Sequence, residues 1–396
     1  MASSADNTYA SLTHKQIFDA GVQDELRDGV YFTQVADVRS DDGEYIYSRY
    51  GSDGVASTTS DDTYVTSAFT YNKDTLGLDN TAYMAEHISQ DEMVKEGFMI
   101  QADRINRHAE AIARKINRDT AIATLEGAGT TLDNGGLTGS NDGNWIALSS
   151  TNADEVATTV MQKLQEANAT GFTPYMMMRP KDAKQFGLYA MNSGNVVADT
   201  TILGGFKRSN FFGFDIYVTN DVPHSTTVVG TSVIATDVLT VAGVGMTVIA
   251  SPSTAGHIDL GADDNETLSN IAAAINGGAG AGTAYIEVSA ANRAIWKALN
   301  LKATVSGTTL TIVGNSAFTV VSADATMVVD TDGQATSILA GARQSTVLRL
   351  PTGGYHSKVL DQVNNFFGVQ LRTAQKYDHI VWTKNAPKIV NVKVDA

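Results

Sequence analysis

The sequence contains no cysteine, so disulfide bonds, thiolate chemistry and cysteine metal ligands are all excluded. It also has no run near the roughly 18 apolar residues that a membrane-spanning helix needs. Its N-terminal segment, MASSADNTYASLTHKQ, lacks the basic region and apolar stretch that together mark a signal peptide. We therefore expect no membrane partner and a chain that is made in a cytoplasm.

Basic residues are scarce. The 396 residues include 28 Lys and Arg against 43 Asp and Glu, which gives a formal net charge of -15 at pH 7. A surface of this sign repels nucleic acid at long range, so we do not expect sequence-specific DNA recognition. Proline is scarce too, with 6 residues against 35 glycines, which favours strands joined by glycine turns. A chain of this length predicts two or three domains.

Sequence motifs for catalysis are also missing. The P-loop, the nucleophile elbow, the paired-histidine zinc motif and the dinucleotide-binding glycine pattern do not occur. The glycine-rich stretch 277–283 follows a predicted helix and has the wrong spacing, so we interpret it as a linker. The acidic turns 133–136 and 330–334 offer too few oxygen ligands for calcium, and the seven histidines are scattered. We predict no catalytic residue, no cofactor-binding residue, no metal site and no enzymatic activity.

The N-terminal part of the chain has little core of its own. Residues 14–28 predict a short amphipathic helix with Ile17, Val22 and Leu26 on one side. Residues 43–86 follow as a strand-like stretch in which both faces mix polar and apolar side chains. An isolated two-stranded ribbon is only marginally stable in water. We therefore expect this ribbon to lie on something else, such as another subunit.

A long helix is the strongest local signal. Ser89 and Glu92 fit a capping box, and Gly127 and Gly129 would end the helix near Glu126. At 1.5 Å per residue such a helix is about 50 Å long. Apolar residues recur at helical spacing along one stripe, at Val94, Phe98, Ile105, Ala109, Ile112, Ile116 and Ile122. Acids alternate with the cations Arg104, Arg107, Arg114, Lys115 and Arg118, which predicts a solvated or intersubunit face rather than a nucleic-acid patch.

An α/β layer follows the long helix. Residues 130–150 are turn-rich and predict a loop. Asn152 should cap a helix over 153–168, with its inward side formed by Val156, Val160, Met161 and Leu164. The apolar run 175–179 predicts a buried strand, after which Pro180 begins another helix. A further strand is predicted over 213–219.

Residues 226–338 differ in composition from their surroundings. This stretch is rich in Gly, Ala, Thr and Val, and it has nine acidic residues against the three basic residues Arg293, Lys297 and Lys302. We predict a helix over 265–276, which Gly277 ends, and a hairpin turn at Ser306-Gly307. The predicted strands are 237–242, 246–250, 256–260, 284–289, 302–306, 309–313, 317–321 and 326–330. The pattern indicates a compact acidic domain that is inserted into another domain.

The chain ends in three stretches of alternating apolar residues, at 366–372, 377–382 and 387–394. We expect these strands to complete the sheet that the strand ending near Asn220 leaves open. The host domain is then split in sequence by its insert.

The order of these elements resembles the major capsid protein of tailed bacteriophages, which has the Hong Kong 97 type fold. The phrases YMMMRPKDAKQFGLY and GFDIYVTNDVP are similar to a strand, proline, helix and strand of that family's A-domain, and NETLSNIAAAINGG is similar to segments of other phage structural proteins. The resemblance implies an α+β fold with an N-terminal arm at 1–42, an extended E-loop at 43–88, and a spine helix with part of the P-domain at 89–150. It further implies a split A-domain at 151–225 and 339–396, and an inserted β-rich domain at 226–338.

The resemblance also implies a function. A capsid protein of this family self-assembles as hexamers and pentamers into an icosahedral shell around the double-stranded DNA of a tailed phage. The expected partners are other copies of the chain, a scaffolding protein, a portal and a decoration protein, with packaged DNA contacted only non-specifically. The expected location is the virion capsid, after assembly in the cytoplasm of a bacterial host. Some relatives cross-link a ribbon lysine to a neighbouring subunit, and Lys73 lies in the ribbon, but no partner residue can be named here.

Two other interpretations stay open at this point. One is another phage tail or filament structural protein, although a flagellin-like chain would have heptad-rich helices at both ends. The other is a hydrolase whose active-site residues come together only in space, which a pocket that joins histidine and carboxylates would favour.

Overall fold

The computed structural model describes residues 30–41, 43, 45–51, 71–89, 99–137, 145–169, 171–192, 207–329, 335–361 and 368–395. The chain divides into two compact units, Met1–Gly127 with Arg343–Pro387 and Ala128–Ala342 with Lys388–Ala396. Both units contain helices and strands, so the expected α+β class is confirmed. The predicted helix over 14–28 lies outside the described residues.

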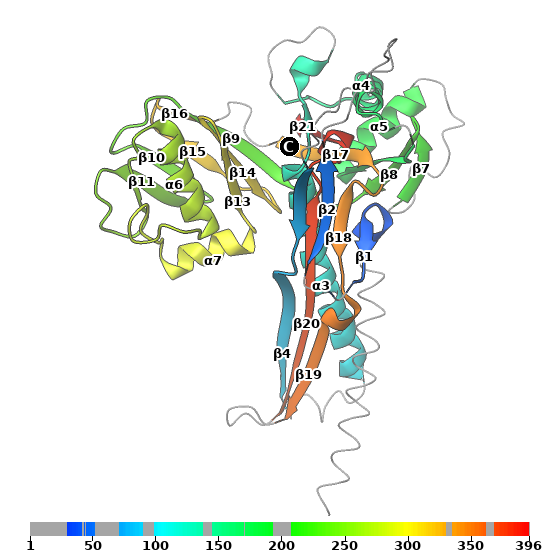
Figure 1. The fold of residues 1–396 in the computed structure, drawn as a ribbon, viewed down its shortest axis with the longest axis horizontal. Helices are drawn as coiled ribbons and strands as arrows, with labels where there is room; N and C mark the ends of the chain where they lie inside the picture. Colours follow the sequence, from blue (N-terminus) through cyan, green and yellow to red (C-terminus); the bar gives the residue numbers. More distant parts are fainter. Residues whose placement is uncertain are drawn as a thin grey trace, which may run out of the picture. The chain divides into compact units, whose positions relative to one another are not determined.

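The first unit is built on one long strand, β20 (Gly368–Val381). It pairs in antiparallel fashion with β4 (Asn80–Ser89) on one side and with β19 (Tyr355–Asp361) on the other. Toward its C-terminal end it pairs with β18 (Thr346–Arg349), which in turn pairs in parallel with β1 (Asp37–Arg39). The helix α3 (Met99–Glu126) packs on β20 and β4 (Figure 1).

The described part of α3 confirms the predicted apolar stripe. Ala109, Ile112, Ile116 and Ile122 are all buried. Val94 and Phe98 lie outside the described residues, as does the side chain of Ile105. The predicted N-cap, Ser89, is instead the last residue of β4 and pairs with Gly368, so this end of the capping box belongs to the sheet.

The prediction of two separate strands at 366–372 and 377–382 was wrong, because β20 is a single strand. The polar stretch around Thr373 and Gln375 breaks the apolar alternation, yet both side chains are buried and the ladders to β4 and β19 continue through it. The strand also lies in the first unit, so it does not complete the sheet that contains residues 213–219.

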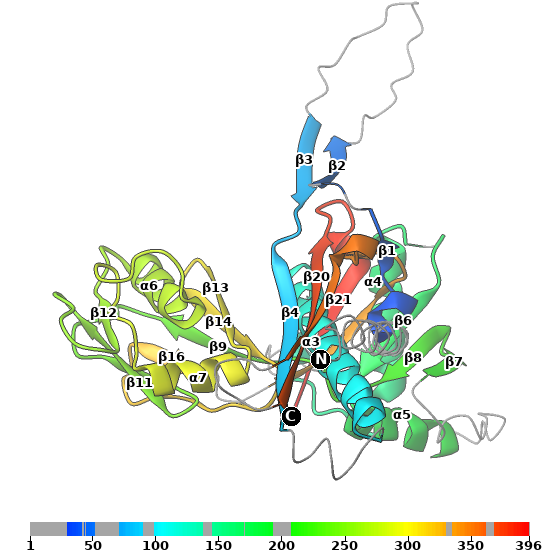
Figure 2. The same cartoon turned by 90° about the horizontal axis from the view of Figure 1, so that it is seen from below.

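The ribbon of the first unit consists of β2 (Ile46–Gly51) and β3 (Tyr71–Leu76), which pair in antiparallel fashion along six residues each. Figure 2 shows both strands extending beyond the ends of β4 and β20. The predicted ribbon also included residues 80–86, but these belong to β4 and to the main sheet of the unit.

The second unit contains a sheet in the order β13-β14-β9-β17-β6-β8-β7, which β16, β21 and β5 extend. β6 (Pro174–Met178) and β8 (Phe214–Val218) are the two predicted strands, and they pair in parallel. The unpredicted strands are β7 (Lys207–Phe211), β9 (His224–Gly230) and β17 (Ala335–Ala342). β21 (Ile389–Asp395) pairs with β17, as expected of a closing strand, and also with β5 (Thr130–Leu132), which lies in a stretch predicted to be loop.

Two helices belong to this sheet, α4 (Ala153–Glu166) and α5 (Pro180–Asn192). Val156, Val160 and Leu164 are buried, as predicted, and Pro180 is the first residue of its helix. Asn152 precedes α4, but its side chain accepts a hydrogen bond from the Ser149 N–H, 2.9 Å away, rather than from the first turn of the helix. These helices share one buried hydrophobic cluster with β6, β8, β17 and β21.

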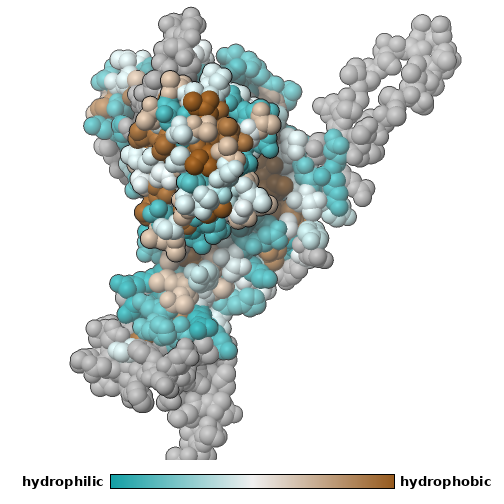
Figure 3. Space-filling view, turned by 90° about the vertical axis from the view of Figure 1, so that its left-hand side faces the viewer, coloured by the Kyte–Doolittle hydropathy of each residue, from teal (hydrophilic) through white to brown (hydrophobic). Residues whose placement is uncertain are grey.

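Residues 228–327 hold a second, separate hydrophobic cluster. It is covered by α6 (Asp264–Asn276) and α7 (Ala290–Ala298) and includes a four-stranded sheet of β12 (His257–Asp259), β11 (Val244–Ile249), β10 (Val238–Val241) and β15 (Val320–Ser322). β13 (Lys302–Ser306), β14 (Thr309–Gly314) and β16 (Met327–Val329) continue the larger sheet from β9. Several large apolar side chains of this part are exposed, namely those of Val229, Ile234, Ile295, Val321 and Val328. Figure 3 shows brown, hydrophobic patches on the surface of this part.

Most predicted elements of residues 226–338 are present, but one predicted strand is absent and one helix was missed. The stretch 284–289 is not a strand, since only isolated bridges form at Tyr285. Its alternating sequence lacks a neighbouring strand, and Ser289 instead caps the unpredicted helix α7 by accepting from the Asn292 N–H.

Candidate functional site

The anchoring contacts of the described part of the ribbon of β2 and β3 lie near its root, where the Asp74 carboxylate accepts from the N–H and the hydroxyl of Thr383, at 2.8 and 3.1 Å. Ile46 and Leu76, which face each other across the two strands, pack against Val347, Ile380 and Trp382. No other described residue of the ribbon belongs to a buried cluster. Further out, Tyr47 is 53% exposed and carries the Lys73 ammonium 4.4 Å from its ring centroid. The ribbon is thus a polar and aromatic surface that contributes almost nothing to the core of its own unit.

The sheet face that points away from α3 is also uncovered and is basic in character. Alternation along β4, β20 and β19 places the exposed residues Tyr83, Arg372, Lys376, His356 and Lys358 on it. Tyr83 is 78% exposed, although a large aromatic side chain gains most from burial. The outward positions between Thr81 and His87, and their partners on the other two strands, include no acidic residue. In a chain with a net charge of -15, such a face is suited to an acidic partner surface.

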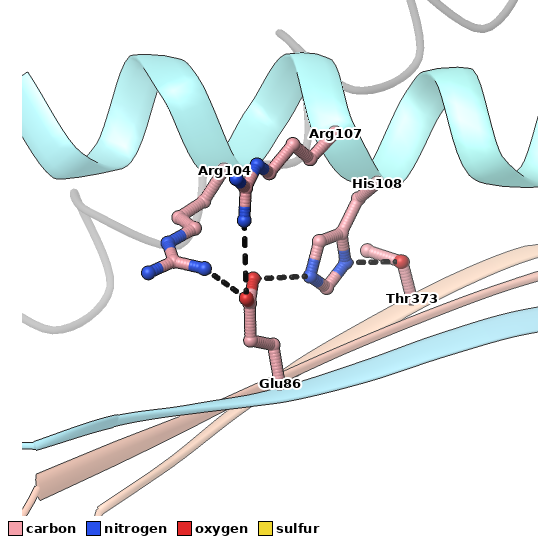
Figure 4. A network of polar contacts seen from close by, with 5 residues as sticks. All are labelled: Glu86, Arg104, Arg107, His108 and Thr373. Atoms are coloured by element: carbon pink, nitrogen blue, oxygen red, sulfur yellow. Dashed lines mark hydrogen bonds and ion pairs between the residues drawn. The ribbon is translucent and has the colours of Figure 1, made fainter.

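The opposite sheet face meets α3 through a cluster of charged side chains (Figure 4). Glu86 of β4 forms ion pairs with Arg104 and, at 3.8 Å, with Arg107. Its other carboxylate oxygen lies 3.6 Å from Nε2 of His108, whose Nδ1 lies 2.7 Å from Oγ1 of Thr373. The cluster therefore ties the helix to two strands.

A hydroxyl that contacts an imidazole, which in turn contacts a carboxylate, is also the arrangement of a hydrolytic triad. His108, however, is 0% exposed and lies beneath α3, so a substrate could not reach Thr373 through this arrangement. Desolvation by burial lowers the pKa of His108, against the opposing effect of Glu86, so the imidazole is neutral at pH 7. We interpret the cluster as a packing anchor, and its geometry does not favour the hydrolase alternative.

A second buried polar group lies in the second unit, between β6 and β9. The Arg179 guanidinium contacts Nε2 of His224 and donates to the Val222 carbonyl, 3.1 Å away. Burial, and then the charge of Arg179, lowers the pKa of His224 to about 4, so this imidazole stays neutral and accepts. Burial raises the pKa of Asp182, at the start of α5, to about 6, although Lys181 and Arg179 oppose the shift.

We expect Asp182→Asn to stabilise the protein at pH 7.5. The folded state favours the protonated carboxyl, so Asp182 costs stability as the pH rises from about 4 through about 6, and the amide removes that cost. The gain should be about 1 to 3 kcal/mol at pH 7.5, because one pKa unit corresponds to about 1.4 kcal/mol, and close to zero at pH 4. Urea unfolding across this pH range measures it.

Glu166→Gln is the matched control for this substitution, because Glu166 is exposed on α4. It should change the free energy of unfolding at pH 7.5 by less than about 1 kcal/mol, because only an exposed ion pair with Lys163 is lost. Equal pH dependence in the parent and in Asp182→Asn would contradict the assignment.

Other kinds of site are not apparent in the described part of the chain. A pocket of about 380 Å³ in the second unit has no titratable side chain in its lining, which consists of Met161, Leu164, Gln165, Ala169, Phe172, Pro174, Gly213 and Ala342. Among the described residues, no group of three or more His, Asp or Glu is placed to hold a metal ion. No described helix is long and apolar enough to cross a membrane.

Comparison with known proteins gives matches at the level of structure. No protein-family model and no curated protein matches the sequence. The chain resembles phage capsid structures.

Three similar structures match this chain over most of its length, and over most of their own, at low sequence identity. A structure of Mycobacterium phage Che8 is 12% identical, with a TM-score of 0.48 and coverage of 91% of this chain and 90% of that one. The capsid structure of the cyanophage P-SCSP1u is 10% identical, with a TM-score of 0.48 and coverage of 91% and 86%. A virus-like particle from Pyrococcus furiosus is 10% identical, with a TM-score of 0.40 and coverage of 94% and 98%.

The structure also places the cations that the sequence singled out on α3. Arg114 pairs with Glu110 and Lys115 with Asp119, as the alternation of charges along the helix predicted. The pairing of Arg104 with Glu86 could not be predicted, because the acid comes from a different element. Asp119 also accepts a hydrogen bond from the Tyr377 hydroxyl of β20.

Proposed function

We propose that the chain is the subunit of a self-assembling protein shell. The observation that carries this proposal is the ribbon of β2 and β3, which has a buried root and, beyond it, exposed residues such as Tyr47 that belong to no buried hydrophobic cluster among the described residues. Paired strands without a core become stable when they lie on another surface. The uncovered sheet face of β4, β20 and β19 is a surface of the right kind. Repetition of one contact around a closed symmetry then strengthens interactions that are individually weak.

The details of the proposed shell follow from the resemblance of the sequence. We propose hexamers and pentamers in an icosahedral capsid around the double-stranded DNA of a tailed phage, assembled in a bacterial cytoplasm with a scaffolding protein and joined by a portal and a decoration protein. Residues 1–42 would be the arm, 43–88 the E-loop, 89–150 the spine helix with part of the P-domain, and 151–225 with 339–396 the A-domain and closing segments. Packaged DNA would be contacted only non-specifically, as suits an acidic chain.

We further propose that residues 226–338 are an inserted domain that folds by itself and is displayed on the shell. Its hydrophobic cluster is drawn wholly from residues 228–327, which supports an independent core. The exposed Val229 and Val328, which are directly opposed on β9 and β16, give it a small apolar surface for a neighbour. The strand β17 starts at Ala335, pairs with β21, and contributes Ile338 to the hydrophobic cluster of α4 and α5. Residues 335–338 therefore pack with the proposed host domain.

Assembly can be tested on the full chain, expressed alone and with a scaffolding protein, by sedimentation and negative-stain electron microscopy. We expect closed particles of uniform size. Open tubes would favour the filament alternative, and a monomer that stays monomeric under both conditions would contradict the proposal.

A charge reversal tests whether the uncovered sheet face takes part in assembly. We expect Arg372→Glu to leave the subunit folded but to prevent particles from closing, because it breaks the charge pattern of that face. Lys297→Glu, on the exposed side of α7, is the matched control and should assemble.

A further inference from the structure

Arg349 of β18 is a fully buried charge at the root of the ribbon, with a relative exposure of 0%. Its Nη1 donates to the Gly77 carbonyl at 2.8 Å, just after β3. Its Nε and Nη2 donate to the Asp41 carbonyl at 3.2 and 3.1 Å, and Nη2 also contacts the Gly43 carbonyl, just before β2. One guanidinium therefore holds both chain segments through which the ribbon leaves the core.

The carbonyls that Arg349 binds lie outside any strand, so they have no ladder partner there. A guanidinium presents five N–H donors in a rigid plane and can serve several carbonyls at once. A lysine ammonium, whose three donors radiate from one point on a flexible stem, cannot reproduce this arrangement.

The residue opposite Arg349 completes the arrangement. Asp378 of β20 pairs with Arg349 in the strand register. Its carboxylate accepts from the Asn80 side chain at 3.0 Å and from the Asp79 N–H at 3.5 Å. The turn between β3 and β4 is thus held by a cation on one side and an anion on the other.

Stability alone is a poor explanation for such a residue. Burying a charge is costly, and well-packed apolar replacements of buried charges are often neutral or stabilising. The apolar packing of Ile46 and Leu76 already attaches the ribbon to the unit. What the apolar contact lacks is direction, because hydrophobic contacts are not directional, whereas the hydrogen bonds of Arg349 are.

We propose that Arg349 is a positioning residue that sets the direction in which the ribbon leaves its unit. Its consequence for assembly rests on the proposed function: a subunit with an undirected ribbon closes shells slowly or wrongly. The direction of the ribbon itself can be measured in a single, unassembled chain.

The absence of cysteine makes the test direct, because two introduced cysteines are the only labelling sites. Asn72→Cys on β3 and Ala111→Cys on α3, both exposed, carry spin labels on the ribbon and on its unit. Pulsed electron spin resonance on the full-length, unassembled chain then measures the distance between them. We expect a narrower distance distribution in the parent than in Arg349→Met and Arg349→Lys, in which the ribbon can leave its unit in more directions.

Arg39→Lys is the matched control. Arg39 faces Arg349 across the pairing of β1 and β18, but its side chain is 50% exposed and forms an ion pair with Asp37. It should keep the distance distribution of the parent. An unchanged distance distribution in folded Arg349→Met would overturn the proposal. If neither Arg349 variant folds, the residue is needed for folding and the positioning role is likewise rejected. Failure of the parent chain to form particles would reject the proposed function while leaving the distance result for Arg349 intact.

Discussion

Replacing Ile116 with aspartate should abolish folding of the unit that contains α3. The Ile116 side chain is 0% exposed, in the middle of the stripe that packs on the sheet of β4 and β20. Aspartate loses the apolar burial and places a charge at a position that is closed to water. Together these effects should exceed about 5 kcal/mol, which approaches the whole stability of an ordinary domain. Solubility on expression and urea unfolding of the full chain measure the loss.

Ala111→Asp is the control for this experiment, because Ala111 lies on the exposed side of the same helix. It should change stability by less than about 1 kcal/mol. A soluble Ile116→Asp variant with the unfolding midpoint of the parent would show that α3 faces the sheet differently.

Replacing Trp296 with alanine should unfold residues 238–329 while the rest of the chain stays folded. Trp296 of α7 is 2% exposed and donates from Nε1 to the Val241 carbonyl at 3.1 Å, within the cluster that belongs to this stretch alone. Its truncation removes this hydrogen bond and leaves a cavity, at a cost of about 3 to 5 kcal/mol. Hydrogen exchange read by mass spectrometry should show loss of protection over 238–329 but not over α4 or α5, which belong to the other hydrophobic cluster of the same unit.

Ile295→Ala is the matched control, since the neighbouring residue on α7 is 43% exposed. It should keep protection near that of the parent. Loss of protection over α4 and α5 as well in the Trp296→Ala variant would mean that residues 226–338 share one cooperative core with the rest of the second unit, against the proposed inserted domain.

Elements with strong local signals could be predicted from the sequence. The helix α6 is one case, because Asp263 caps its N-terminus, Glu266 bonds back to the Ala262 N–H, and Gly277 ends it in the left-handed region at φ 68°. The hairpin of β13 and β14 is another, since Gly307 at φ 59° supplies the turn between two alternating segments. In each case the information lies within a few residues.

Elements that depend on distant partners could not be predicted in the same way. β20 continues through a polar stretch because β4 and β19 pair with it on both sides, and the alternating residues 284–289 stay out of a sheet because no strand pairs along them. The sequence did indicate a ribbon without a core and a charged helix face. It could not indicate that Arg349 serves carbonyls 272 and 308 residues away, or that Glu86 meets His108, because nothing in the local sequence marks a long-range polar contact.

Hydrogen exchange at the ribbon and at the uncovered sheet face tests the account most directly, because its central claim is that other copies of the chain cover these surfaces. The full-length chain should be compared as unassembled subunits and as purified particles, over 46–51 and 71–76 of the ribbon and over β4. We expect fast exchange of the ribbon in the subunit and at least about tenfold slower exchange in the particle, as a further 1.4 kcal/mol of protection would give. Equal exchange in both states would contradict the claim that the ribbon is an assembly surface.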